Sequence, residues 1–175
     1  MVIMRILVIL LFSSALLRAG QIEVFFSPKG GCTEAVVDAL SNAKTSVFVQ
    51  AYSFTSVPIA KALIDAQKRG VKISVILDKS NQADKYTAAT TLANYGIEPL
   101  IDSKHAIAHN KIMILDGKTI LTGSFNFTKA AESNAENLLV IHDSTLAAKY
   151  LANWQEHQKH SHPYEPSQGT SPRKR

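Results

Sequence analysis

Cysteine is almost absent from the sequence, because Cys32 stands alone among 175 residues. A single cysteine excludes an intrachain disulfide framework and any zinc site built mainly from thiolates. We interpret Cys32 as a partly buried thiol without a chemical role. Because 46% of the residues are hydrophobic, the chain is long enough to fill the core of one domain and short for two.

An excess of positive charge is also missing from the body of the chain, although the formal net charge is +5. Arg5 and Arg18 lie near the N-terminus, and Arg173, Lys174 and Arg175 lie at the C-terminus, so these residues account for the whole excess. Overall basicity therefore does not argue for nucleic-acid binding. A local basic patch stays open as an interpretation, with the C-terminal residues as a cationic arm.

Residues 1–20 have the features of an export signal. Arg5 supplies positive charge, residues 6–12 are uninterrupted apolar side chains, and residues 13–15 are small. The apolar run over residues 6–17 is shorter than the roughly 20 residues that a membrane-spanning helix needs. We therefore predict a signal peptide and a periplasmic or secreted protein. The alternative is an uncleaved N-terminal membrane anchor.

Hydrophobic patterning along the rest of the chain predicts strands that alternate with helices. We expect strands at residues 22–26, 46–52, 71–77, 97–101 and 136–142, and helices at residues 33–43, 57–69, 83–94 and 144–157. This alternation predicts an α/β fold with a mixed, largely parallel β-sheet flanked by helices on both faces. We place the domain at residues 21–160 and a disordered basic tail at residues 161–175.

A β-hairpin interrupts the alternation, because Asp116-Gly117 lies between two apolar runs. A two-residue loop would set Leu115 opposite Lys118 and, further along, His109 opposite Ser124. Side chains alternate along a strand, so one face of this hairpin would carry four polar groups. These are the side chains of His109, Lys111, Ser124 and Asn126.

These four polar groups lie within a hydrophobic segment, where unmatched polar groups are costly, and their coincidence therefore indicates a functional site. Ammonium, hydroxyl and amide groups are donors that suit phosphate oxygens, and an unprotonated imidazole is a nucleophile toward phosphorus. No nearby carboxylate cluster could hold Mg²⁺, and His105 and His109 lack partners at zinc spacing. We therefore expect metal-free phosphoryl transfer through a phosphohistidine, without a cofactor. The turn explains Asp116 structurally.

The same residues resemble a long family signature. His109-x-Lys111, Asp116 and Gly123-Ser124-x-Asn126 match the HxKxxxxDxxxxxxGSxN pattern of the phospholipase D superfamily without a gap. The chain most resembles the small secreted bacterial endonucleases of that superfamily, which carry one motif per chain. The similarity extends over about residues 22–154.

The resemblance implies a role for each matching residue. His109 would be the nucleophile, and Lys111, Ser124 and Asn126 would hold the phosphate. Glu136 occupies the position of the family's acidic residue that orients a histidine, with a strand-edge carboxylate as the alternative. Asp116 and Gly123 match the motif, so a site role for Asp116 stays open beside its structural one. The fold implied is a mixed sheet with flanking helices.

Three functions remain after these observations. We expect a sequence-nonspecific endonuclease that hydrolyses DNA or RNA. The first alternative is a phospholipid or cardiolipin hydrolase of the phospholipase D type, for which a retained leader would serve as the membrane anchor. The second is a nucleic-acid-binding module without catalysis, which is disfavoured because every catalytic position of the motif is filled.

In-line displacement at phosphorus also predicts a homodimer. The nucleophile and the leaving oxygen lie on opposite sides, so His109 cannot also protonate the leaving group, and a second acid is needed there. The only other His-x-Lys, at His157-Gln158-Lys159, lacks the rest of the motif. We therefore expect a two-fold axis that places a second His109 across the phosphate, with the active site at the dimer interface.

Overall fold

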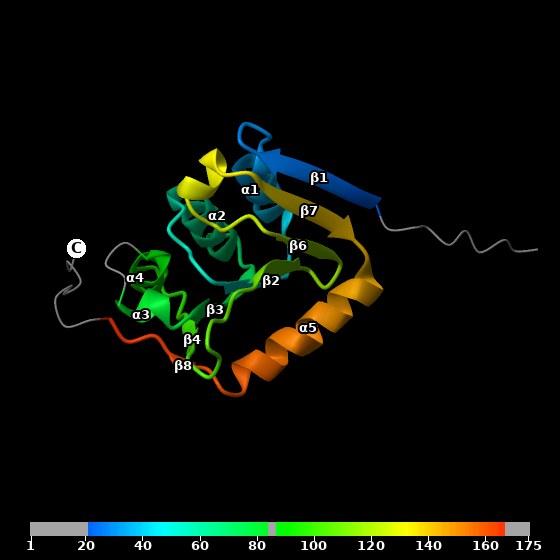
Figure 1. Ribbon diagram of the computed structural model, residues 1–175. Helices are drawn as coiled ribbons and strands as arrows, with labels where there is room; N and C mark the ends of the chain where they lie inside the picture. The colour runs from blue at the N-terminus through cyan, green and yellow to red at the C-terminus, as the bar shows by residue number, and fades with distance from the viewer. Residues whose placement is uncertain (1–20, 84–86, 167–175) are drawn as a thin grey trace, which may run out of the picture.

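The computed structural model describes residues 21–83 and 87–166. Eight strands form one sheet in the order β1-β7-β6-β5-β2-β3-β4-β8 (Figure 1). The strands are β1 (Gln21–Ser27), β2 (Ser46–Ala51), β3 (Lys72–Asp78), β4 (Leu100–Asp102), β5 (Lys111–Leu115), β6 (Thr119–Gly123), β7 (Glu136–His142) and β8 (His162–Pro163). The helices are α1 (Cys32–Asn42), α2 (Val57–Lys68), α3 (Ser80–Ala83), α4 (Ala88–Asn94), a 3-10 turn (Ala130–Ser133) and α5 (Ser144–Gln158).

The sheet is mixed, as predicted, but it is not largely parallel. Among the described strands, the parallel pairs are β2–β3 and β3–β4, which are joined through α2 and through α3 and α4. The pairs β1–β7, β7–β6, β6–β5, β5–β2 and β4–β8 are antiparallel. The reason is that β5, β6 and β7 follow one another without a long helical crossover, which only parallel neighbours require.

Helices cover both faces of the sheet, as predicted. One hydrophobic core joins the sheet to α1, α2 and α4, and a second core lies between the sheet and α5 (Figure 1). Trp154 of α5 anchors the second core, because its indole N–H donates to the carbonyl of Val49 at 2.9 Å and its ring packs edge-on against Phe48. Cys32 is buried at the start of α1, and burial raises the pKa of its thiol.

The predicted helix at residues 83–94 is wrong in one respect. The short helix α3 ends at Ala83, and α4 begins at Ala88, where the Thr87 side chain accepts a hydrogen bond from the amide of Ala89. Thr87 is a strong N-cap residue, and such a cap starts a new helix rather than continuing one. None of the helices within residues 21–83 and 87–166 is both long enough and apolar enough to cross a bilayer. The predicted leader lies outside the described residues.

The first part of the predicted tail belongs to the fold. Residues His162–Pro163 form β8 and pair with β4, and the Tyr164 hydroxyl lies 2.8 Å from the Thr90 hydroxyl. The amide of Tyr164 also donates to the carbonyl of Pro99. The predicted start of the disordered tail at residue 161 is therefore too early, because residues 162–164 are part of the fold. Residues 167–175 lie outside the described residues.

The hairpin has the predicted turn but a different register. Asp116 and Gly117 both have positive φ, and the Lys118 amide donates to the Leu115 carbonyl at 2.9 Å. Leu115 nevertheless pairs with Thr119 rather than with Lys118, so the ladder is shifted by one residue. A shift of one residue moves every side chain to the opposite face. The four polar groups therefore do not meet on one face of a continuous hairpin.

Candidate active site at one edge of the sheet

His109, Lys111, Ser124, Asn126 and Glu136 lie at one end of the sheet, where several strands end. β2 ends at Ala51, which pairs with Lys111 at the start of β5. β6 ends at Gly123, which pairs with Leu138 near the start of β7. The paired ends of β1 and β7, and of β3 and β4, lie at this same end of the sheet. We call it the site edge. The convergence thus comes from strand ends rather than from a strand face.

His109 and Lys111 form a contacting pair at the site edge. His109 is exposed in the loop before β5, whereas Lys111 is buried. The Lys111 ammonium lies 2.9 Å from His109 Nδ1 and donates to the His109 carbonyl at 2.6 Å. A charged ammonium can only donate, so in this arrangement His109 Nδ1 accepts and a neutral ring carries its proton on Nε2.

The surroundings of Lys111 combine an aromatic ring with a carboxylate. Burial lowers the pKa of Lys111, and the negative charge of Glu136 opposes part of that shift. The Lys111 nitrogen lies 5.2 Å from the centroid of the Tyr52 ring, which is within the range of a cation–π contact. The Tyr52 ring also lies 4.5 Å from the His109 ring, centroid to centroid. Tyr52 therefore packs against both members of the pair.

Glu136 organises the loop after β6. Its carboxylate accepts hydrogen bonds from the Asn126 amide and from the Asn134 side chain, each at 2.9 Å. Within residues 21–83 and 87–166 of the single chain, no hydrogen bond joins Glu136 to His109. The orienting role that the family resemblance implies for Glu136 is thus not formed with the histidine of its own chain here.

Gly123, Ser124 and Asn126 follow a backbone path that approaches β7 closely. Gly123 has φ 151°, and a Cβ at this position would lie 2.2 Å from the carbonyl oxygen of Asn137, so only glycine fits. The Ser124 hydroxyl is exposed and accepts a hydrogen bond from the Asn137 amide at 3.0 Å. The side-chain oxygen of Asn126 is buried without a hydrogen-bond partner among the described residues. A buried unpaired polar atom is costly, so Asn126 is suited to receive a group from a substrate or partner.

Asp116 lies at the far end of β5 from Lys111, away from the site edge. Its carboxylate accepts hydrogen bonds from the amides of Lys44, Thr45 and Ser46 and from the Thr45 hydroxyl. Burial opposes ionisation, but these hydrogen bonds outweigh it and hold the pKa of Asp116 below its usual value. The structure therefore gives Asp116 a role in joining the β5–β6 turn to the start of β2.

The loop that carries His109 is fastened by residues that sequence reasoning did not single out. The Asp78 carboxylate, buried at the end of β3, accepts a hydrogen bond from the Ala108 amide at 2.7 Å. The Lys79 ammonium donates to the His105 carbonyl at 3.1 Å. Both anchors are distant in the sequence from the loop, and no local pattern indicates them.

The expectation that His105 lacks partners for a metal is wrong. His105 lies beside Asp102, His157 and His160, and the four ligand atoms fall within 4.8 Å of one another. Burial opposes ionisation of Asp102, but hydrogen bonds from His157 and the Lys104 amide, together with the nearby imidazoles of His160 and His105, outweigh it, and the pKa of Asp102 is lowered. The spacings Asp-x-x-His and His-x-x-His were the sequence signal for this group.

Comparison with known proteins gives a consistent family. A family model described as "Cardiolipin synthase, PLD-like domain" matches residues 36–158. The chain is 44% identical over 139 residues to a protein named "Phospholipase D" from Rickettsia bellii. The alignment covers 79% of this chain and 69% of that protein. The chain is also 27% identical over 153 residues to the human "Mitochondrial cardiolipin hydrolase". That alignment covers 82% of this chain and 61% of the human protein.

Two solved structures match over nearly their whole length. Nuc from Salmonella typhimurium, described as a phospholipase D family member, aligns with a TM-score of 0.81 at 39% identity, over 84% of this chain and 99% of Nuc. NucT from Helicobacter pylori aligns with a TM-score of 0.78 at 25% identity, over 83% of this chain and 100% of NucT. The sheet and its helices are therefore shared with both proteins.

Proposed function

The chain belongs to the phospholipase D superfamily as a hydrolase of phosphodiester bonds, and we propose that it is a sequence-nonspecific endonuclease acting through a phosphohistidine. The observation that carries the proposal is the pair at the site edge, an exposed His109 imidazole with the buried Lys111 ammonium 2.9 Å from it. The exposed ring can meet a phosphate in a long polymer, and the ammonium supplies positive charge where the phosphate would lie.

The reaction requires two displacements at phosphorus. In the first, His109 Nε2 forms a bond to phosphorus while the bond to the leaving oxygen breaks, and a protonated imidazole on the opposite side donates its proton to that oxygen. In the second, that imidazole accepts a proton from water, whose oxygen attacks phosphorus while the bond to His109 breaks. The products are a phosphomonoester and a free hydroxyl, and both imidazoles return to their starting states.

The contact between Lys111 and His109 must change when a phosphate binds. Attack through Nε2 requires that this nitrogen be unprotonated, so a neutral His109 must then carry its proton on Nδ1. An Nδ1–H cannot face an ammonium, because both are donors. The Lys111 ammonium therefore turns from Nδ1 to the phosphate, where the Ser124 hydroxyl and the side-chain NH₂ group of Asn126 supply further donors. Substrate binding itself sets the reactive tautomer.

Exposed lysines along the site edge favour a polyanionic substrate. Lys29, Lys79 and Lys104 follow the ends of β1, β3 and β4, and all three are exposed. The two carboxylates at these strand ends, Asp78 and Asp102, are buried. Positive side chains spread along the same edge as the reacting phosphate suit the neighbouring phosphates of a nucleic acid, which attract them without regard to sequence.

Stacking against bases has one candidate at the site. Tyr52 is half-buried beside His109, and aromatic rings in such positions hold bases without sequence preference. Phe54, Phe125 and Phe127 are fully buried and belong to the hydrophobic core, so they offer no surface to a base. The similarity to Nuc, at 39% identity over 99% of its chain, is consistent with a small single-motif enzyme.

A phospholipid substrate is the second candidate. It is favoured by the names of the relatives, "Phospholipase D" in Rickettsia bellii and "Mitochondrial cardiolipin hydrolase" in humans. The chemistry at phosphorus is the same for both substrates, so the choice depends on what flanks the phosphate. The lysines along the site edge weigh toward nucleic acid.

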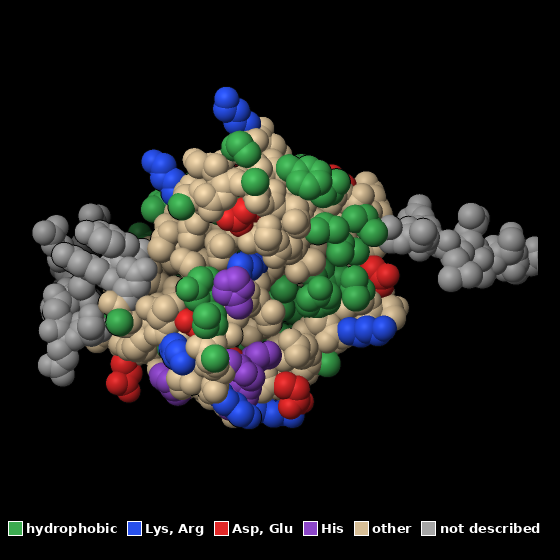
Figure 2. All heavy atoms as spheres, in the orientation of Figure 1, with side chains coloured by type: hydrophobic (Ala, Val, Ile, Leu, Met, Phe, Trp, Pro, Cys, Tyr) green, Lys and Arg blue, Asp and Glu red, His purple; other side chains and the backbone are tan. Residues whose placement is uncertain are grey.

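A second copy of the chain completes the site in this proposal. Ile22, Val24 and Phe26 alternate along β1 and are exposed by 61%, 52% and 59%. Figure 2 shows hydrophobic side chains gathered over this part of the sheet. Phe26 pairs with Asn137, next to Glu136, so this apolar strip reaches the site edge. Its burial against a two-fold-related copy would bring two His109 side chains across one phosphate.

The proposed location is outside the cytoplasm, in the periplasm or the medium. The proposal rests on the apolar run over residues 6–12 and the small residues that follow it. N-terminal sequencing of protein recovered from an outer compartment should begin between residues 16 and 21. Full-length protein found in the membrane fraction would contradict export by cleavage.

The substrate class is tested by one panel of reactions. Purified protein is incubated with plasmid, single-stranded DNA, RNA and labelled cardiolipin vesicles. We expect cleavage of nucleic acid by the unaltered protein and none by the His109→Ala variant. The matched control is His142→Ala, which removes an exposed histidine at the opposite end of β7. Hydrolysis of cardiolipin with intact nucleic acids would overturn the nuclease proposal and favour the lipid one.

A further inference from the structure

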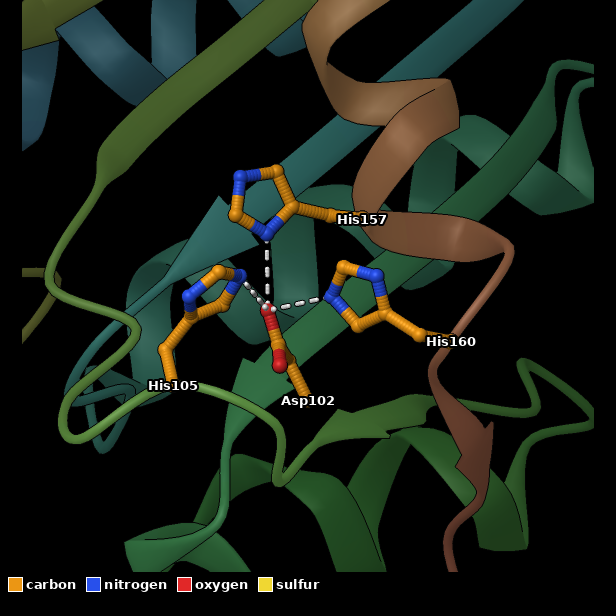
Figure 3. Close-up of side chains that lie close together, drawn as sticks. All are labelled: Asp102, His105, His157 and His160. Atoms are coloured by element: carbon orange, nitrogen blue, oxygen red, sulfur yellow. Dashed lines mark hydrogen bonds and ion pairs between the residues drawn. The ribbon is translucent and has the colours of Figure 1, made fainter.

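Three histidines surround one buried carboxylate at the far side of the site edge (Figure 3). Asp102 ends β4, and His105 follows in the next loop, while His157 and His160 come from the C-terminal end of α5 and the turn after it. His157 Nδ1, His160 Nε2 and His105 Nε2 lie 2.7, 3.3 and 3.7 Å from the same oxygen, Asp102 Oδ2. The Asp102 side chain is fully buried.

Hydrogen bonding among these groups does not account for the arrangement. His105 Nε2 and His160 Nε2 are buried and have no hydrogen-bond partner among the described residues. Both nitrogens point toward the single oxygen that His157 already contacts (Figure 3). Buried polar atoms are normally satisfied, and two unpaired nitrogens directed at one carboxylate oxygen are suited to share a cation with it.

The three separations measured from Asp102 Oδ2 are close to the ligand spacing of a tetrahedral metal site, and all four ligand atoms lie within 4.8 Å of one another. With metal–ligand distances of about 2.0–2.1 Å, the ligand atoms of tetrahedral zinc lie about 3.3 Å apart. The separations from Asp102 Oδ2 run from 2.7 to 3.7 Å and so bracket that value. Imidazole nitrogen with one carboxylate oxygen is a ligand set that suits zinc, while Mg²⁺ and Ca²⁺ prefer oxygen alone.

We propose that Asp102, His105, His157 and His160 bind one Zn²⁺ ion. Four protein ligands fill the tetrahedral shell and leave no position for water or substrate, which is the pattern of a structural site. The strand pairs Lys111–Ala51, Ala51–Leu77 and Leu77–Ile101 separate the active site from β4. Three strand spacings amount to about 14 Å, so the ion does not touch the reacting phosphate.

The ion would join two segments that are distant in the sequence. It fastens the end of β4 and the His105 loop to the C-terminal end of α5, just before β8. That loop continues through Ala108, which Asp78 holds, to His109. A bound ion would therefore stabilise the folded chain and steady the loop that presents the nucleophile, without taking part in the displacement.

His105→Gln is the cleanest variant for testing the site. The His105 side chain is 42% exposed and its Nε2 has no hydrogen-bond partner, so its replacement removes a ligand without breaking the metal-free fold. His160→Gln, which removes the second unpartnered nitrogen, is the companion variant. His142→Gln is the matched control, because that histidine lies at the opposite end of the sheet.

Zinc binding is measured on the full chain, purified without a histidine tag. The protein is stripped with a chelator and titrated with Zn²⁺ against a competing dye. We expect about one ion per chain with tetrahedral ligation, seen as the visible absorption of a Co²⁺ derivative. His105→Gln should bind at least about 100-fold more weakly, because even the outer partners of ligands cost 10–100-fold. The control should bind as the unaltered protein does.

Thermal unfolding separates a bound ion from a simple cluster of histidines. An ion that binds only the folded state must raise the Tm of the unaltered protein and of His142→Gln, and leave that of His105→Gln nearly unchanged. In chelator, the unaltered protein and His105→Gln should unfold at similar temperatures. The proposal would be overturned if the unaltered protein did not bind zinc. It would also be overturned if His105→Gln and His160→Gln both bound zinc as tightly as the unaltered protein does.

Discussion

Replacing Asp116 by asparagine should destabilise the fold while leaving the chemistry intact. The Asp116 carboxylate accepts from the Lys44 amide at 2.9 Å, the Thr45 amide at 2.7 Å, the Thr45 hydroxyl at 2.9 Å and the Ser46 amide at 3.1 Å. In the variant, an NH₂ group faces one of these donors and the remaining bonds lose their charge assistance. Hydrogen bonds to charged groups contribute about 1.5–3 kcal/mol each. Because Asp116 is half-exposed and water replaces part of the loss, we expect a cost of about 2 kcal/mol.

The assay for this variant pairs thermal unfolding with turnover. A cost of about 2 kcal/mol should lower the Tm by about 4–8 °C in a chain of this size. The matched control is Asp38→Asn, which removes an exposed carboxylate of α1. Turnover measured well below both Tm values should stay close to that of the unaltered protein. A variant with the original Tm but no activity would refute the structural role of Asp116.

The effect should also depend on pH, with a sign that follows from the lowered pKa of Asp116. A carboxyl whose pKa is lower in the folded state contributes stability above its unfolded pKa, and this contribution is lost as the pH falls through the folded value. The Tm difference between the unaltered protein and Asp116→Asn should therefore be full at neutral pH and shrink below about pH 4. A difference that grows in acid would contradict this reasoning.

Three further outcomes are expected from the proposed chemistry. Lys111→Ala should lower the rate by about 10²–10³-fold, as removal of one transition-state donor does. The control is Lys118→Ala, which removes an exposed lysine. Unchanged turnover by Lys111→Ala would show that Lys111 does not hold the phosphate. Cleavage measured well below the Tm should persist in excess EDTA, because no step uses a metal, and a loss that Mg²⁺ restores would contradict the phosphohistidine. Sedimentation should show a dimer with a bell-shaped pH–rate profile, and excess His109→Ala protein should suppress activity under subunit exchange; a fully active monomer would rule out the shared site.

Much of the fold could be predicted because its elements carry local signals. Short stretches of neighbouring residues predict the alternation of strands with helices and the turn at Asp116-Gly117, and the structure confirms both. The order of strands in the sheet depends on contacts between residues that are distant in the sequence. No local pattern predicts that β1 lies at an edge of the sheet, antiparallel to β7. The predicted register of the hairpin was wrong for a similar reason. Asp-Gly specifies the turn, but whether Lys118 enters the ladder depends on the strands beyond it.

The site was predictable in composition and less so in geometry. The motif spacing indicated His109 and Lys111, which the structure places in contact. Their grouping with Ser124 and Asn126 was expected from a shared strand face, whereas the structure groups them through strand ends. The partners of Asp102 were missed, because His157 lies 55 residues away in sequence. Only the fold brings the end of α5 to the end of β4.

The direction of β1 limits what a membrane-held form of this protein could reach. Gln21 starts the strand opposite His142, and Ser27 ends it opposite Glu136 at the site edge. The strand is therefore about 20 Å long between its attachment point and the active site. Residues 18–20 can span at most about 10 Å when extended. A chain tethered by its leader would thus carry its active site at the end of β1 remote from the tether, which favours polymers in the surrounding fluid over lipids next to the attachment point.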